Sequence, residues 1–207
     1  TFSFGIHPSA FVETRLKIHK DVSIGSNAII CGNISIDSGS IISDSAIIIG
    51  DVEIGKNFKV NSGTVIGQNG FNYSRDEKKI PHEFPHVGKV LIGDNVTIRS
   101  NCTIARGSLS NSIIGDNVKL DDQVHIAHNV NIDNNTLIAA KALISGSVVI
   151  GKNVWISPNA SIIDHVKIGD SSKIGIGAIV TKDVPKNATV IGAPSRVLSL
   201  DKIKWKR

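Results

Sequence analysis

Large side chains are scarce in this sequence. Its 207 residues include no methionine, only eight leucines and 4% aromatic residues, against 34 isoleucines and 19 valines. Isoleucine and valine lose side-chain freedom in helices and pack well on the pleated surface of strands. The composition therefore argues against a helical bundle and predicts a β protein with a narrow, regular core.

Several kinds of segment are also missing. No apolar run approaches the length of a membrane span, and the chain does not start with a basic and then apolar signal peptide. The two cysteines, Cys31 and Cys102, are far apart, which favours a reducing, cytoplasmic setting. No two of the seven histidines are five positions apart, so a zinc site built on a His-x4-His pair is not expected, and we predict no metal.

The positive charge of the chain is modest. The formal net charge is +5, and no basic stripe carries interleaved aromatic residues. Nucleic acid is therefore not a predicted partner. The surplus fits a small anionic ligand, such as a phosphate, better.

An aliphatic residue recurs at every sixth position over most of the chain, which is the signature of a repeat protein. The repeat forms three unbroken series, and chance does not explain series of this length. Their members are Ile6, Val12, Ile18, Ile24, Ile30, Ile36, Ile42, Ile48, Ile54, Val60 and Ile66; Ile92, Ile98 and Ile104; and Ile114, Leu120, Ile126, Ile132, Ile138, Ile144, Ile150, Ile156, Ile162, Ile168, Ile174 and Val180.

Each hexad is predicted to be a short strand followed by a turn. The residue two positions before the repeated aliphatic is usually small or apolar, and this spacing places both on one face of a strand. Asn or Gly often follows three positions later, as at Asn27, Gly63 and Asn117, and these residues accept positive φ. Three hexads would close one coil of 18 residues, so the 26 hexads predict between eight and nine coils.

This pattern resembles the left-handed parallel β-helix of hexapeptide-repeat acyltransferases. The predicted fold class is therefore all-β, with a left-handed β-helix over residues 1–185 and a capping tail over residues 186–207. The left hand comes from the resemblance, because a period of six does not determine it. The resemblance also implies a homotrimer with each active site in a groove between two chains.

The repeat is interrupted over residues 67–90, which read GQNGFNYSRDEKKIPHEFPHVGKV and contain the only tyrosine. Loops that leave a rigid scaffold commonly carry function. We therefore predict a ligand-contacting arm, with Asn69, Phe71, Tyr73 and His86 as substrate-binding residues. A solvated surface excursion is the alternative.

Residues 67–130 closely resemble one family. The stretches GQNGFNYS and GKVLIGDNVTIRSNCTIARGSLSNSIIGDNVKLDDQVHIAHNV are similar to the UDP-3-O-acylglucosamine N-acyltransferases of lipid A synthesis. In that family the histidine of the IAHN motif is the catalytic base, and here that residue is His128. A second family histidine lies 37 residues further on, at the position of His165. The resemblance implies that both lie in the active site with Asn129, whereas position alone leaves them as ordinary turn residues.

Two features depart from that family. Its members begin with an extra uridine-binding domain, whereas this sequence starts directly in repeats at FGIHPSAFVE. Its end, VIGAPSRVLSL, resembles acetyl-CoA-dependent sugar and antibiotic acetyltransferases. We therefore predict transfer of an acetyl group from acetyl-CoA to the amino group of a nucleotide-linked amino sugar, as in surface polysaccharide synthesis. The alternatives are a lipid A-type N-acyltransferase, a sugar O-acetyltransferase and a non-catalytic β-helix scaffold.

Coenzyme A is expected along the later coils. Related β-helix acetyltransferases place a glycine amide against the thioester carbonyl one coil after the catalytic histidine, and that position is Gly146. The phosphates of the coenzyme require cations. Candidates are Lys152, Lys167, Lys173 and Arg196, which are equally explained as solvated surface charges.

Overall fold

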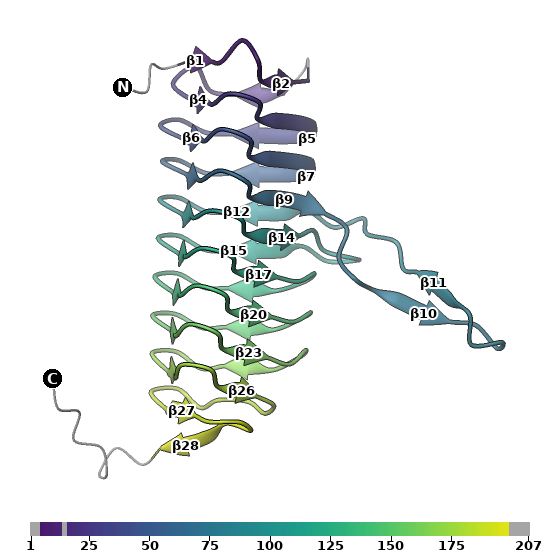
Figure 1. The fold of residues 1–207 in the computed structure, drawn as a ribbon, viewed down its shortest axis with the longest axis vertical. Helices are drawn as coiled ribbons and strands as arrows, with labels where there is room; N and C mark the ends of the chain where they lie inside the picture. Colours follow the sequence, from purple (N-terminus) through teal and green to yellow (C-terminus); the bar gives the residue numbers. More distant parts are fainter. Residues whose placement is uncertain (1–4, 14–15, 199–207) are drawn as a thin grey trace, which may run out of the picture.

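The computed structural model describes residues 5–13 and 16–198, which form one column of stacked coils with a long arm on one side (Figure 1). Within these ranges every regular element is a β-strand. Each coil contributes strands to three flat faces, and strands 18 residues apart pair in parallel, as Leu120 pairs with Ile138. The hexad pattern thus gives a three-sided parallel β-solenoid.

Face 1 is an eleven-stranded sheet in which the neighbours pair in parallel except at its last strand. Its strands, in spatial order, are β1 (Gly5–Ile6), β4 (Ser23–Ile24), β6 (Ile41–Ile42), β8 (Lys59–Val60), β13 (Thr97–Ile98), β16 (Lys119–Leu120), β19 (Leu137–Ile138), β22 (Trp155–Ile156), β25 (Lys173–Ile174), β27 (Thr189–Ile191) and β28 (Arg196–Leu198).

Faces 2 and 3 belong to one fifteen-stranded sheet, because β5 and β7 each run over both faces and bend between them at Gly32 and Gly50. Both glycines have positive φ, 116° and 79°, a conformation that side chains disfavour. Face 2 contains β2 (Phe11–Val12), the first halves of β5 (Ile29–Ile36) and β7 (Ile47–Ile54), β9 (Val65–Gln68), β14 (Thr103–Ala105), β17 (His125–Ile126), β20 (Leu143–Ile144), β23 (Ser161–Ile162) and β26 (Ile179–Val180). Face 3 contains β3 (Lys17–Ile18), the second halves of β5 and β7, β12 (Val90–Ile92), β15 (Ser112–Ile114), β18 (Asn131–Ile132), β21 (Val149–Ile150) and β24 (Lys167–Ile168).

The corners use the residues that the sequence indicates. Asn27 and Asn117 adopt left-handed φ values of 55° and 59° at the predicted turn position. The same position keeps this conformation where the residue is less suited to it, as at Lys141 and His165, with φ values of 61° and 62°. The stacking of coils therefore imposes the turn even where the residue does not favour it.

The repeated aliphatics form the buried core, apart from those of the first coil. Ile30, Ile66 and Ile132 are fully buried, whereas Ile6, in the first described coil, is 53% exposed. Ten parallel strands on face 1 correspond to about ten coils, more than the eight to nine predicted. One reason is that Val190 pairs with Ile174 and continues the face beyond the last regular hexad.

The C-terminal end of the column is covered by two strands. β27 pairs in parallel with β25, and β28 turns back to pair antiparallel with β27. An antiparallel strand at the last coil occupies the hydrogen-bonding edge that would otherwise face solvent. The capping role of residues 186–207 stays a prediction, and residues 199–207 of this tail lie outside the described residues.

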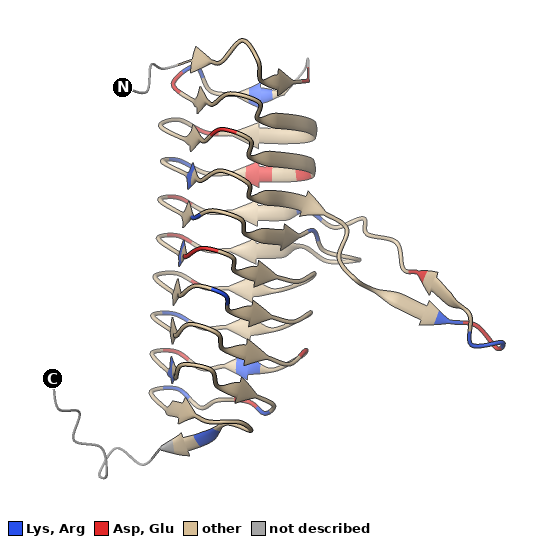
Figure 2. Cartoon of the chain, in the orientation of Figure 1, with Lys and Arg blue, Asp and Glu red and all other residues tan. Residues whose placement is uncertain are grey.

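The arm leaves face 2 after β9 and returns to face 3 at β12 (Figure 1). Its outer part is an antiparallel hairpin of β10 (Tyr73–Arg75) and β11 (Pro81–Glu83). Charged residues of both signs gather at the hairpin tip (Figure 2). The arm therefore projects from the middle of the column, next to the coil that carries His128.

Arg106 anchors the returning segment of the arm to the column. Its Nη2 donates to Asp51 Oδ2 at 2.6 Å, and its Nε donates to the carbonyl of Gly88 at 2.8 Å. A hydrogen bond from Asn33 and the neighbouring Arg106 guanidinium hold the pKa of Asp51 below its usual value. Together these two contacts of Arg106 fix the place where the arm rejoins the column of coils.

Candidate active site

His128 lies on the corner between faces 2 and 3, in the turn that follows β17, as its place two residues after Ile126 predicts. Its Nδ1 lies 2.8 Å from Oδ1 of Asn129, the next residue. Asn129 is in the left-handed conformation, with φ of 61°. The corner therefore turns the Asn129 side chain back onto the imidazole.

The orientation of the Asn129 amide follows from its other partners. Its Nδ2 donates to the carbonyl and the hydroxyl of Ser110, at 3.0 and 2.7 Å. Its Oδ1 accepts from the backbone N–H of Ser108 at 3.2 Å, and this N–H can only donate. Because Oδ1 is an acceptor, neutral His128 must carry its proton on Nδ1, which leaves the lone pair on Nε2.

Two glycines lie against the ring of His128. A methyl group added to Gly146 would come within 2.8 Å of Cε1 and 2.9 Å of Nε2. A methyl group added to Gly70, in the arm, would come within 2.9 Å of Cβ and 3.0 Å of Cδ2. His128 is thus held at Nδ1 by Asn129 and enclosed by backbone on two sides, and only glycine leaves room for the ring.

The backbone N–H of Gly146 lacks an acceptor that several of its equivalents in other coils have. At this turn position the N–H of Ser26 donates to Asp44, and the N–H of Lys152 donates to Asp170, in each case 18 residues further on. The equivalent partner of Gly146 is Asp164, whose Oδ2 instead lies 3.8 Å from Nε2 of His165. Within the described residues the N–H of Gly146 donates to nothing, so a free donor lies beside Nε2 of His128.

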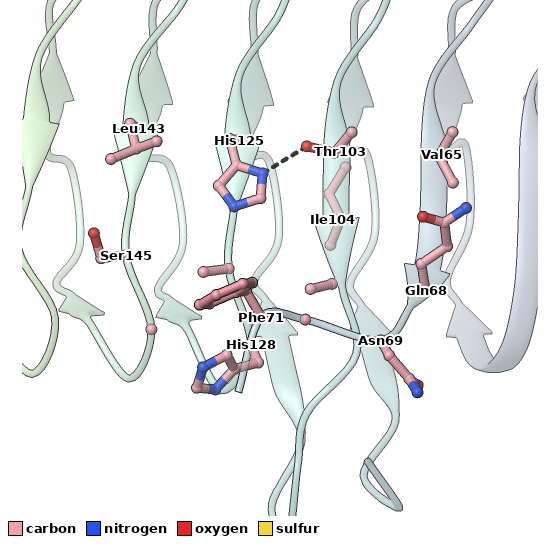
Figure 3. Close-up of a pocket in the computed structure, with 14 residues that line it drawn as sticks. Val65, Gln68, Asn69, Phe71, Thr103, Ile104, His125, His128, Leu143 and Ser145 are labelled. Atoms are coloured by element: carbon pink, nitrogen blue, oxygen red, sulfur yellow. Dashed lines mark hydrogen bonds between the residues drawn. The ribbon is translucent and has the colours of Figure 1, made fainter. Parts of the chain in front are cut away.

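Two cavities meet at this point, and Phe71, His128, Ser145 and Gly146 line both. The first, of about 360 Å³, lies over face 2 (Figure 3). The second, of about 800 Å³, lies between the arm and the corner. An arrangement with one cavity on each side of a basic nitrogen can bring two substrates together at that nitrogen.

Comparisons with known proteins identify the repeat. Residues 111–146 and 147–182 match the family described as bacterial transferase hexapeptide (six repeats). Over residues 111–182 the chain carries this hexapeptide repeat. The match covers the later, uninterrupted coils, and the same hexad continues in the coils before it.

Curated relatives of this chain are acyltransferases by name. UDP-3-O-acylglucosamine N-acyltransferase of Coxiella burnetii (strain Dugway 5J108-111) is 38% identical over 136 residues, and that of Pseudomonas syringae pv. syringae (strain B728a) is 36% identical over 138. These matches cover 57% and 58% of this chain, but only 40% and 39% of the relatives. The chain therefore spans about two fifths of their length.

Solved structures confirm the fold. UDP-N-acetylglucosamine O-acyltransferase (LpxA) from Moraxella catarrhalis RH4 superposes with a TM-score of 0.87 at 26% identity, covering 95% of this chain and 75% of that chain. The UDP-N-acetylglucosamine acyltransferase from Campylobacter jejuni gives 0.86 at 27% identity, with the same coverage of both chains. The predicted left-handed parallel β-helix is confirmed by this likeness.

The predicted arm residues occupy different places. Asn69 lines the face 2 cavity, Tyr73 lines the arm cavity, and Phe71 lines both. His165 lines the arm cavity with Asp164. His86 lines neither of them: it is buried beneath the arm, with 8% of its surface exposed.

The structure does not bring the predicted coenzyme-binding cations together. Lys167 lies on face 3, Lys173 on face 1 and Arg196 on β28, while Lys152 lies in the turn between β21 and β22. None of the four lines either cavity. Their binding role stays a prediction.

Four polar residues that line the face 2 cavity are absent from the predicted site: Gln68, Thr103, His125 and Ser145. His125 lies one residue before the buried Ile126, and Thr103 Oγ1 is 2.6 Å from its Nδ1 (Figure 3). Burial lowers the pKa of His125. Gln68 comes from the last position of β9. The register of the coils offered a signal for His125, since it places Thr103 and Leu143 on either side of it.

Two findings concern the described residues as a whole. No helix in these ranges is long and apolar enough to cross a membrane. No three His, Cys, Asp or Glu side chains in the same ranges gather into a group that could hold a metal ion.

Proposed function

We propose that this protein transfers an acyl group from a thioester to the amino group of a nucleotide-linked amino sugar, with His128 as general base. The observation that carries the proposal is the unprotonated Nε2 of His128, which lies beside the free N–H of Gly146 where two cavities meet. The names of the relatives, all acyltransferases, support the reaction class.

The reaction would use these two groups in turn. Nε2 of His128 removes a proton from the neutral amine as its nitrogen attacks the thioester carbonyl, because the nitrogen would otherwise become positively charged as it forms the new bond. The carbonyl oxygen becomes negatively charged, and the N–H of Gly146 donates to it. The intermediate then collapses, the carbon–sulfur bond breaks, and the imidazolium returns its proton to the thiolate. The products are an amide and a free thiol.

Asn129 would hold the imidazole of His128 in one tautomer and one orientation throughout this cycle. Its Oδ1 accepts from Nδ1–H of His128 in both protonation states, and a carbonyl oxygen there also stabilises the imidazolium. Ser108 and Ser110 hold the amide in turn. This support corresponds to the third group that orients a general base in hydrolytic triads.

We propose acetyl-CoA as the donor. The GAPSR segment after β27 resembles acetyl-CoA-dependent enzymes. The outward positions of face 2 below the cavity support a short acyl group, because Leu143 and Ile179 are separated by Ser161 and do not form a continuous apolar row. A long chain gains about 0.8 kcal/mol per methylene only where it is buried. The names of the relatives favour a second candidate, a long-chain N-acyltransferase of the lipid A type.

We also propose that the protein acts as a homotrimer in the cytoplasm. Exposed apolar side chains on the outer surface of face 2, including Phe11 at 59% exposed, support contact between chains. The unpaired cysteines Cys31 and Cys102 agree with a reducing compartment. Light scattering should give about three times 22.0 kDa, and a stable, active monomer would contradict the shared groove.

A donor competition tests the proposed function. Acetyl-CoA and a long-chain acyl carrier protein are supplied together with a panel of UDP-linked amino sugars, and products are identified by mass spectrometry. Acetylated product should dominate. A dominant long-chain amide would favour the second candidate, and an ester would identify an O-acyltransferase. His128→Ala removes the proposed base. His19→Ala is its matched control, because it removes an exposed histidine of an early turn.

A further inference from the structure

His86 lies at the centre of the arm's root and is not part of the mechanism above. Its ring is buried, and it meets the ring of His128 edge-on, with the centroids 5.8 Å apart and the planes at 80°. Its Nε2 lies 3.2 Å from the backbone nitrogen of Gly70. Its Nδ1 is buried and, among the described residues, has no hydrogen-bond partner.

The protonation of His86 follows from these contacts. The N–H of Gly70 can only donate, so Nε2 of His86 must accept and cannot carry a proton. Burial and the nearby His128 lower the pKa of His86, and Arg106 acts in the same direction, while the Phe84 carbonyl and Glu83 oppose them. His86 therefore stays neutral with its proton on Nδ1.

Gly70 links His86 to the base. It belongs to the outgoing segment of the arm, whereas His86 belongs to the returning segment, and their hydrogen bond ties the two segments together. The Cα of Gly70 lies against Cβ and Cδ2 of His128, with no room for a methyl group. Neighbouring Asn69 and Phe71 line the face 2 cavity, so the position of Gly70 also sets one cavity wall.

We infer that His86 is a positioning residue: it holds the Gly70 peptide against the imidazole of His128 and thereby fixes the base and the adjoining cavity wall. This inference rests on the proposed role of His128. A neutral acceptor suits this place, because a protonated His86 would face the Gly70 N–H with a second donor and place a positive charge beside the imidazolium formed in the reaction.

Two substitutions at His86 test whether the residue acts as a hydrogen-bond acceptor or only fills space. His86→Leu fills the buried site with an apolar side chain and removes the acceptor, and kcat should fall by about 10- to 100-fold, as expected when a catalytic group is misplaced by about 1 Å. His86→Gln keeps an oxygen that can accept from Gly70, and it should recover most of that loss. His82→Leu is the control, because this exposed arm histidine contacts Asp76 and not Gly70.

Gly70→Ala tests the same link from the other side, with His86 intact. The added methyl group meets the ring of His128, so kcat should fall by a similar factor. Nitrogen-15 NMR of the histidine rings, without any substrate, should show His128 as one Nδ1–H tautomer in the wild type and in His86→Gln. Both His86→Leu and Gly70→Ala should show altered His128 signals.

Rates are measured with acetyl-CoA and a UDP-linked amino sugar, and folding is checked by thermal unfolding. Wild-type kcat and unchanged His128 signals in His86→Leu or in Gly70→Ala would overturn the inference. A rate in His86→Gln as low as in His86→Leu would also overturn it, because the ring itself would then be required. Wild-type turnover in His128→Ala would instead refute the proposed base, while the NMR comparison would still decide whether His86 positions that ring.

Discussion

The regular turns of the column and the turn next to the arm use the same backbone position differently. At a regular turn such as that of Lys152, the N–H donates to an aspartate one coil further on, here Asp170. At the turn next to the arm, the N–H of Gly146 has no acceptor among the described residues although Asp164 lies one coil further on, and Asn129 bonds serines of a loop that breaks the repeat. The surroundings of His128 therefore depend on the arm and on this loop as well as on the repeat.

The largest expected effect concerns the base itself. His128→Ala should lower turnover by about 10²- to 10⁴-fold, the usual contribution of a general base. The thermal midpoint should change little, because His128 is not among the buried aliphatics of the column. Steady-state rates beside thermal unfolding test this, and wild-type turnover would show that the arm region does not hold the chemistry.

Gly146→Ala should have the second-largest effect on turnover. The added methyl group would come within 2.9 Å of Nε2 of His128, so we expect turnover to fall by about 10²-fold. Gly151→Ala is the matched control, since its methyl group meets the side chain of Asp170 in a regular turn. It should lower stability and leave kcat of the folded protein unchanged. Equal losses of kcat in the two variants would show that the turn at Gly146 is no more important for catalysis than a regular turn.

A core substitution in the regular coils should act on stability alone. Ile150→Ala removes a fully buried side chain from the column, which costs about 2–5 kcal/mol of unfolding free energy. Denaturant unfolding measures this cost. A cost below about 1 kcal/mol would mean that the later coils are less tightly packed than the burial of their aliphatics indicates.

The smallest effect is a pH dependence at the root of the arm. The pKa of Asp51 is lower in the folded state than in the unfolded state. The ionised carboxylate therefore stabilises the folded state fully above the unfolded pKa of about 3.9, and this stabilisation is lost as the pH falls through the folded-state pKa. The pair with Arg106 is partly exposed, so we expect no more than about 1 kcal/mol. Hydrogen exchange of Gly88 at decreasing pH tests this, and Asp51→Asn should remove the dependence.

A large part of the candidate site could be predicted from the motif around His128. That motif placed His128 and Asn129 on one corner, and the coil length placed Gly146 one turn away. The partners that determine the His128 tautomer, Ser108 and Ser110, could not be predicted, because they come from a loop without periodicity. Their distance from Asn129 depends on the path of that loop in space.

The sequence by itself determined the coil. A period of six aliphatics with Asn or Gly at the turns predicted short strands joined by regular corners, and three such hexads close each coil of the column. Only the tertiary structure decided what the arm does. It buried His86 against Gly70, and it brought His125 into a cavity wall. The physical reason is that contacts within a repeat recur at a fixed spacing, whereas contacts between the two ends of a long excursion depend on how that excursion folds back.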